Sequence, residues 1–269
     1  MSKFIVLFPR LEIRGANAQP AWWFLAPPSP TAYVGFGQAL ALKCLPPGSN
    51  DEFIGVGAVV HDFRLRAERL PDSYQWHPHQ HRAATLIDKA DYADTKTLAL
   101  SAQPSARCDL TVSLAVVFEE GASVDAELIE RFMRSARVAG GTVEGDAIQY
   151  ELHADMAQVK QRLKTGFSLH ARPDLMKPRA GEDTHDALLR ATRSTPDNRE
   201  ANPWVMPALF GFSRVTPVQD RIWTRDGLPH AFAEPLIGLV QLKSLRDAPI
   251  PVWKYQKPSH SNRVFLVGH

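Results

Sequence analysis

A two-residue alternation of apolar and polar side chains, repeated in three segments, is the sequence feature that most constrains the fold. The first segment covers 4–14, where an apolar run is followed by Leu11 and Ile13 alternating with polar residues. The second segment spans 53–65 and the third spans 109–118. Residues two apart in a strand point to the same face, so each segment predicts a strand with one apolar and one polar face.

Helical patterns lie between these predicted strands. A proline-rich entry leads into a helix predicted over 32–42, and an apolar stripe at helical spacing predicts a second helix over 123–139. Ser123 is the predicted N-cap of the second helix, and Gly140-Gly141 is its predicted end. A further strand is predicted over 142–152. This order of strands and helices predicts an α+β fold with a ferredoxin-like split βαβ core.

A long insertion separates the second and third predicted strands, over 69–107. A compact core does not need so long a connection, so we expect the insertion to project. The predicted organisation is a core over 1–152 that carries this insertion, followed by a C-terminal extension over 153–269. Within the extension we expect a helix at 154–164, a strand at 167–171, a flexible polar stretch at 172–203 with a short helix at 186–193, and short strands with loops over 204–269.

Composition narrows the class of protein. The 269 residues include only two cysteines, which is too few for a disulfide framework and favours a reducing, cytoplasmic environment. No apolar stretch approaches the roughly 20 residues that span a bilayer, so we expect no membrane association. The net charge is +2, but 160–269 holds 17 basic and 10 acidic residues, whereas 117–159 holds 3 and 9. The basic C-terminal half suits a polyanionic partner.

Short motifs in order along the chain resemble a known family. Its N-terminal signature resembles Pro9-Arg10-Leu11, Ala16-Asn17-Ala18, Pro28-Ser29-Pro30 and Gly35-Phe36, and later matches include Gly55-Val56-Gly57, Val60-His61, Arg137 to Gly141 and Gly166 to Leu169. The chain is similar to the type I-F CRISPR-associated Csy-two (Cas-five-f) family, although that family generally has a longer helical stretch where 172–203 lies.

The resemblance implies a non-catalytic subunit of a type I-F-like Cascade surveillance complex, with an RRM/RAMP-type ferredoxin-like core. Such a subunit holds the five-prime handle of the guide RNA and caps the backbone filament, with the insertion acting as a thumb that crosses the RNA. The implied partners are the guide RNA and the backbone and large subunits of the complex. Target double-stranded DNA is a further candidate partner where no separate large subunit exists.

Candidate RNA ligands follow from the polar strand faces and from the thumb. Arginines on the first two strands could contact phosphates, and aromatic or histidine side chains could stack on unpaired bases. The residues predicted to bind RNA are Arg10, Arg14, Asn17, Phe36, His61, Arg64, Arg66, Trp76, His79, Arg82, Gly140 and Gly141.

Histidines leave an enzymatic alternative open. His77, His79 and His81 share one face of an extended strand, but Pro78 disfavours a central strand, so we expect no metal site and no cofactor. His61 could act as a general acid or base, although a lone strand histidine is more often a hydrogen-bonded core residue. Two alternatives to guide-RNA binding remain: an endoribonuclease that processes the guide precursor, and a protein-interaction module without RNA.

Overall fold

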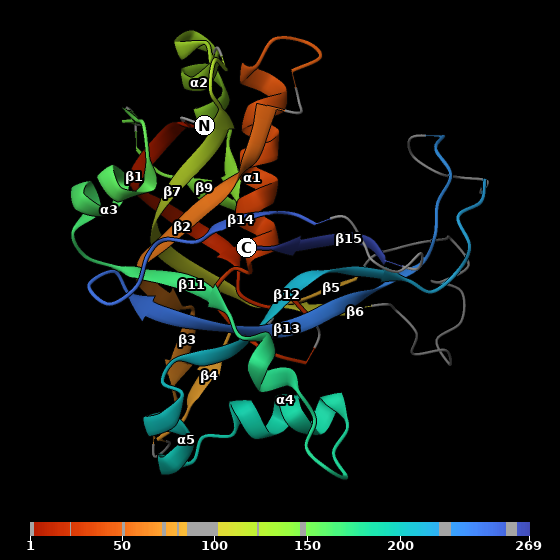
Figure 1. The fold of residues 1–269 in the computed structure, drawn as a ribbon. Coiled ribbons are helices and arrows are strands. Elements are labelled where there is room, and N and C mark those ends of the chain that lie inside the picture. The colour runs from red at the N-terminus through yellow and green to blue at the C-terminus, as the bar shows by residue number, and fades with distance from the viewer. Residues whose placement is uncertain are drawn as a thin grey trace.

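A computed structural model describes residues 3–21, 23–49, 52–71, 74–79, 81–84, 102–122, 124–145, 149–220, 227–256 and 263–269. The predicted α+β class is confirmed: one large antiparallel sheet carries few helices (Figure 1). The sheet runs in the order β11–β13–β12–β15–β14–β2–β7–β1–β9–β8, with β10 also paired to β1. Its strands are β1 (Lys3–Asn17), β2 (Phe53–Leu65), β7 (Arg107–Glu119), β8 (Arg137–Val138), β9 (Gly141–Val143), β10 (Glu151–His153), β11 (Phe167–Ala171), β12 (Val205–Arg214), β13 (Ala233–Ser244), β14 (Val252–Tyr255) and β15 (Arg263–Gly268).

Helices pack on both faces of the strands β2, β7 and β1. The helices are α1 (Pro30–Cys44), α2 (Ala126–Met133) and α3 (Met156–Leu163). The larger core cluster joins α1 and α2 to one sheet face, through residues such as Phe8, Phe36 and Ile129. A smaller cluster packs Val159 of α3 and Leu245 on part of the opposite face. The remainder of that opposite face is polar, and it positions the site described below.

β1 keeps apolar side chains in the main core along its length because the strand contains two bulges. Its buried residues facing α1 include Phe8, Leu11, Ile13 and Ala16, so the two-residue step lengthens to three at two places. The register shifts fall at these same places, between Phe8 and Leu11 and between Ile13 and Ala16. A bulge inserts one extra residue opposite its partner strand. The bulges therefore keep apolar residues inward and turn the alternate side chains outward.

Two β7 side chains hold the bulges. Arg10 has φ 50° and Gly15 has φ 66°, so both bulges place a residue in the left-handed region. The backbone N–H of Arg10 donates to Oγ of Ser113 at 2.8 Å, and that of Gly15 donates to Oδ1 of Asp109 at 2.9 Å. Both N–H groups that the bulges remove from the ladder are thus satisfied.

The second predicted helix is shorter than expected. α2 spans only Ala126–Met133, and its N-cap is Asp125, whose carboxylate accepts from the N–H groups of Glu127 and Leu128. The chain then forms the β8–β9 hairpin, with Ala139 at φ 50° and Gly140 at φ 75° in its turn. Positive φ at both central residues matches the right-handed twist of a hairpin. The glycine pair therefore belongs to a hairpin, and the predicted helix end is wrong.

The strand predicted over 142–152 is two short strands, β9 and β10, which pair with different parts of β1. The insertion also contains paired strands: β3 (Ala67–Arg69) with β4 (Trp76–Pro78), and β5 (His81–Ala84) with β6 (Ala102–Ser105). Residues 85–101 of the predicted thumb lie outside the described residues.

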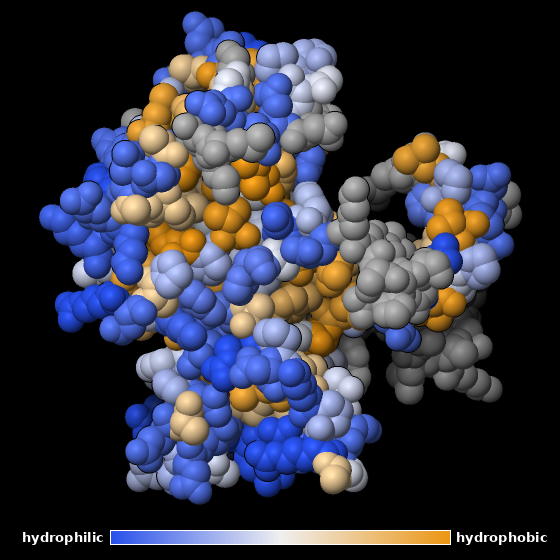
Figure 2. All heavy atoms as spheres, in the orientation of Figure 1, coloured by the Kyte–Doolittle hydropathy of each residue, from blue (hydrophilic) through white to orange (hydrophobic). Residues whose placement is uncertain are grey.

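The C-terminal half is more regular than predicted. The stretch 172–203 contains the 3-10 helix η3 (Pro173–Met176) and the helices α4 (Thr184–Thr192) and α5 (Pro196–Ala201), so the expected short helix is confirmed. A capping box, formed by Asp183 and Asp186, opens α4. β12 and β13 form a long hairpin whose far end stands apart from the body and exposes apolar side chains (Figure 2).

Strands from both sides of residue 152 share the large sheet, since β14 and β11 pair with β2. Among the described residues, no helix is long and apolar enough to cross a membrane.

Candidate nucleic-acid interface

The polar sheet face beyond α3 carries its arginines in transverse rows. Paired residues in antiparallel strands project on the same side of a sheet. Arg137 pairs with Thr142, and Thr142 pairs with Arg14. On the other side of β1, the bulge at Arg14 faces Asp109, which pairs with Arg64. One row therefore crosses five strands, from β8 to β2.

A second basic row lies next to the first, at the end of the sheet. Asn17 pairs with Arg107, and the backbone N–H of Arg66 donates to the carbonyl of Arg107 at 2.9 Å. We name the two rows together the basic band. It consists of Arg14, Arg64, Arg66, Arg107 and Arg137.

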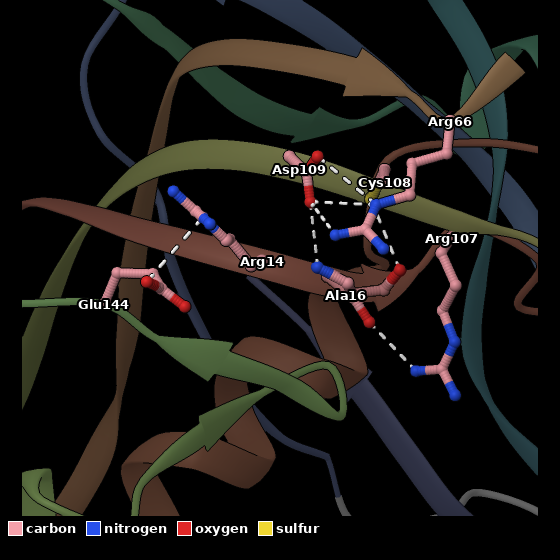
Figure 3. A network of polar contacts seen from close by, with 8 residues as sticks. Arg14, Ala16, Arg66, Arg107, Cys108, Asp109 and Glu144 are labelled. Atoms are coloured by element: carbon pink, nitrogen blue, oxygen red, sulfur yellow. Dashed lines mark hydrogen bonds and ion pairs between the residues drawn. The ribbon is translucent and has the colours of Figure 1, made fainter.

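Asp109 is the counter-ion inside this band. Nη2 of Arg66 donates to its Oδ1 at 2.7 Å and Nε donates to its Oδ2 at 3.3 Å, so the pair is bidentate (Figure 3). The hydrogen bonds from Arg66 hold the pKa of the Asp109 carboxyl below its ordinary value. The same carboxylate accepts from Gly15 in the bulge. The Arg66–Asp109 pair therefore connects β2 to β7 and, through Gly15, to β1. Because Asp109 partly neutralises Arg66, only part of the Arg66 charge is available to a ligand.

The other band arginines are bound more loosely or not at all. Arg107 donates to the carbonyl of Gly15 at 2.9 Å, and Nε of Arg14 lies 3.7 Å from a Glu144 oxygen with 69% of the Arg14 side chain exposed (Figure 3). Such an exposed pair contributes little to stability. Within the described residues, the guanidinium group of Arg64 has no hydrogen bond or ion pair, and the same holds for Arg10, which lies outside the band. Arg14 and Arg64 are thus the band cations most accessible to a phosphate.

An acidic row borders the band. Glu12 pairs with Thr111, Thr111 pairs with Asp62, and the N–H of Glu144 donates to the carbonyl of Glu12 at 2.8 Å. A depression of about 480 Å³ spans the acidic row and the band. Because carboxylates repel phosphates, a polyanion on this face is favoured along the band, across the strands, and disfavoured over the acidic row.

His61 lies beneath this surface as part of the bulge network. Its Nε2 is 2.7 Å from Oγ of Ser113, the hydroxyl that also accepts from the N–H of Arg10. Burial, with a smaller contribution from the Arg10 charge, lowers the pKa of His61 to about 4. The imidazole is therefore neutral at pH 7. This arrangement gives His61 a structural role in the bulge network, and its predicted RNA contact stays a prediction.

Phe36 and the glycines also differ from the predictions. Phe36 is 3% exposed and packs between Phe8 and Phe132, so its predicted RNA contact is wrong. A Cβ on Gly141 would lie 2.7 Å from the backbone nitrogen of Ala16, so its close approach is to its own chain. Gly140 is exposed at the hairpin turn, where its carbonyl accepts from Arg137 at 3.3 Å.

Asn17 is exposed at the end of β1, but its amide oxygen accepts from the N–H of Gln19 at 3.0 Å. Trp76 and His79 line a second depression beside the band, whereas the side chain of Arg82 lies outside the described residues.

Among the described side chains, only Asp183, His185 and Asp186 converge as metal ligands could, and two of these form the α4 capping box.

Two band residues, Arg107 and Arg137, were missed from the sequence. Arg107 continues the polar alternation of β7 by one step beyond the predicted strand start. Arg137 was expected near the end of a helix, although its neighbours Ala136 and Val138 are apolar at a spacing of two. These two patterns, the polar alternation that reaches Arg107 and the apolar neighbours of Arg137, could have added both arginines to the predicted polar face.

A protein that has a broad antiparallel sheet with an arginine band on one open face belongs to the class of proteins suited to bind a polyanion. The family model described as "CRISPR-associated protein (Cas_Csy2)" matches residues 6–266. The chain therefore belongs to the Csy2 (Cas5f) family of the type I-F CRISPR system, as its motifs predicted. A search of curated proteins gave no significant match.

Proposed function

We propose that this chain is a non-catalytic, guide-RNA-binding subunit of a type I-F-like Cascade complex. It holds the five-prime handle of the guide RNA, caps the backbone filament and contacts the backbone and large subunits. Family membership supports assembly with CRISPR components. The strand order β2–β7–β1–β9, with α1 and α2 on one face, supports a ferredoxin-like core for this RNA-binding role.

The observation that carries the proposal is the basic band beside its acidic row. Phosphate contacts fix the register of a nucleic acid, and Arg14 and Arg64 are placed to make them. Asp109 and the bulge hydrogen bonds hold these strands in register before any ligand binds. The handle would therefore cross the strands along the band.

The absence of catalysis is also part of the proposal. A ribonuclease needs an acid and a base, or a metal, near the scissile phosphate. His61 is neutral, partly buried and bonded to Ser113, and His79 lies 3.9 Å from Glu68 at an exposed position. This favours holding RNA over the processing-nuclease alternative.

The salt dependence of RNA binding tests the proposal. If about five phosphates are neutralised, the logarithm of the affinity should fall with the logarithm of the salt concentration with a slope of about −3.5, at roughly −0.7 per phosphate. Arg14→Ala with Arg64→Ala should weaken binding and reduce the slope by about 1.4. The control is Arg131→Ala with Arg134→Ala, which removes two exposed arginines from α2 and its C-cap.

Equal slopes for the band variant, the control variant and the wild type would contradict the proposed RNA path. The same preparations should leave the repeat RNA intact with Mg²⁺ or Mn²⁺ present. Specific cleavage that His61→Ala abolishes would support the nuclease instead.

A further inference from the structure

Six strands of the large sheet form a closed barrel. β11 pairs with β2 as well as with β13, so the pairings run in a ring through β2, β11, β13, β12, β15 and β14. β11 and β14 follow one another along the same edge of β2, and β11 is paired there only through Phe167 and Ser168. Beyond Ser168, this edge of β11 has no ladder partner among the described strands. We call this part of the barrel, at 169–171, the seam.

Two side chains close the seam in place of a strand. The indole N–H of Trp253 donates to the carbonyl of Leu169 at 3.0 Å, and the backbone N–H of Ala171 donates to Nε2 of His269 at 2.7 Å. These two backbone groups belong to residues two apart, which point to the same side of a strand and would bind the same neighbouring strand. The rings of Trp253 and His269 also pack edge to face, with their centroids 4.8 Å apart.

The bond to His269 requires a neutral imidazole. A backbone N–H can only donate, so Nε2 of His269 must accept, and protonation would turn this nitrogen into a donor. The neighbouring His170 differs, because its Nε2 lies 2.9 Å from Oγ of Ser168, a hydroxyl that can donate or accept. That Oγ is also 3.1 Å from the carbonyl of Pro249, so the hydroxyl keeps an acceptor when His170 is protonated.

The charges around the seam disfavour protonation of His269. Lys243 on β13 and Lys254 on β14 lie beside the two imidazoles, and the charge of Arg172 is paired with Asp174. Within the described residues, no carboxylate bonds to either imidazole. Burial lowers the pKa of His269, so the ring is neutral at pH 7. Its bond therefore stabilises the seam above the ordinary histidine pKa of about 6.5, and this stabilisation is lost as the pH falls through the lowered pKa.

We propose that His269 is a proton-sensitive latch on the barrel: its neutral imidazole holds the edge of β11, and its protonation releases that edge. The released N–H of Ala171 then belongs to an unpaired strand edge, which is the kind of surface that pairs with another strand. This inference goes beyond the proposed function, because it concerns the seam of the barrel and not the RNA path.

Hydrogen exchange followed by NMR between pH 4.5 and 8 tests the latch. The measured quantity is the protection factor of the Ala171 amide. The reference is the amide of Arg172, which donates to the carbonyl of Leu239 at 2.8 Å on the other edge of β11. In the wild type, Ala171 protection should be constant above pH 7 and should fall by up to tenfold per pH unit at lower pH, because one proton is taken up. Arg172 should stay protected throughout.

Two variants separate the imidazoles. His269→Gln offers an amide oxygen that does not titrate, so Ala171 protection should no longer depend on pH. His170→Gln is the matched control and should keep the wild-type profile, as the pKa of His170 is already lowered to about 4 by burial and nearby charge. An NMR titration of the His269 ring should have the same midpoint as the loss of protection. A flat wild-type profile, a pH dependence that survives in His269→Gln, or one that disappears in His170→Gln would overturn the latch.

Discussion

At the scale of single residues, side chains of β7 decide the shape of the polar face. Ser113 and Asp109 each complete one bulge of β1, and each also holds a second group, His61 or Arg66. Their removal would affect neighbouring strands as well as β7. Asp109 has an additional effect, because its negative charge lies within the arginine band.

Asp109→Asn should separate these two effects. The amide oxygen can still accept from Gly15, but the ionic pair with Arg66 is lost. Because that pair is partly exposed, we expect the free energy of unfolding to fall by only about 1 kcal/mol. The released Arg66 charge should tighten RNA binding several-fold at low salt.

Urea unfolding and fluorescence anisotropy at two salt concentrations measure both quantities. Glu130→Gln on α2 is the matched control, since it removes one exposed carboxylate away from the band. Weaker RNA binding by Asp109→Asn than by this control would show that the carboxylate itself contacts the ligand.

At the scale of secondary structure, the sequence predicts strands better than helix ends. β2 and β7 follow the alternation where they border the band, because one face there packs on the main core, whereas their middle residues are buried on both faces. In β1 the spacing between successive inward-facing apolar residues is three, not two, from Phe8 to Leu11 and from Ile13 to Ala16, and these are the positions of the bulges. The second helix was overextended because Phe132, Ala136 and Ala139 satisfy a helical spacing as well.

The arginine rows could not be predicted in the same way. Each depends on the register between strands that are distant in sequence, such as Arg64 with Asp109 and Arg14 with Thr142. Alternation gives the face on which a residue lies but not its neighbour across the ladder. Burial of Phe36 likewise depends on Phe8 and Phe132, which no local pattern connects to it.

The β8–β9 turn allows a test at this scale. Ala139 has φ 50°, a conformation that costs about 1 kcal/mol for a residue with a Cβ and that asparagine tolerates better. Ala139→Asn creates an Asn-Gly turn and should raise the free energy of unfolding by about 0.5–1 kcal/mol. Ala126→Asn, at the first residue of α2, is the control and should not stabilise. A destabilised Ala139→Asn would argue against the hairpin.

At the scale of the whole molecule, the insertion and the sheet are separable in principle. β3–β4 and β5–β6 each form a two-stranded sheet of their own, outside the large sheet. We therefore expect the large sheet to fold without the part of the insertion between 72 and 103. The insertion contributes Trp76 and His79 to the second depression, so its loss should act on RNA and not on folding.

Replacing 72–103 with a short Gly/Ser linker tests this expectation. The variant should show cooperative thermal unfolding and unchanged β-sheet circular dichroism, but weaker RNA binding and poor assembly with guide RNA. Its RNA affinity should be no higher than that of Trp76→Ala, which serves as the comparison. Loss of cooperative unfolding would place the insertion within the hydrophobic core.

The pairing of β1 has a consequence for how the chain is made. β1 leaves the ribosome well before its partners, which lie at 107–119, 141–143 and 151–153. At 5–20 residues per second, the apolar N-terminal strand waits roughly 5 to 20 s before β7 is available. One edge of β2 pairs with β7, but the other waits longer still, because Val56 and Gly57 pair with Trp253 and Val252. During synthesis both strands expose unpaired edges, so this protein should depend on chaperones while it is being translated, and fast translation of its first half should favour aggregation.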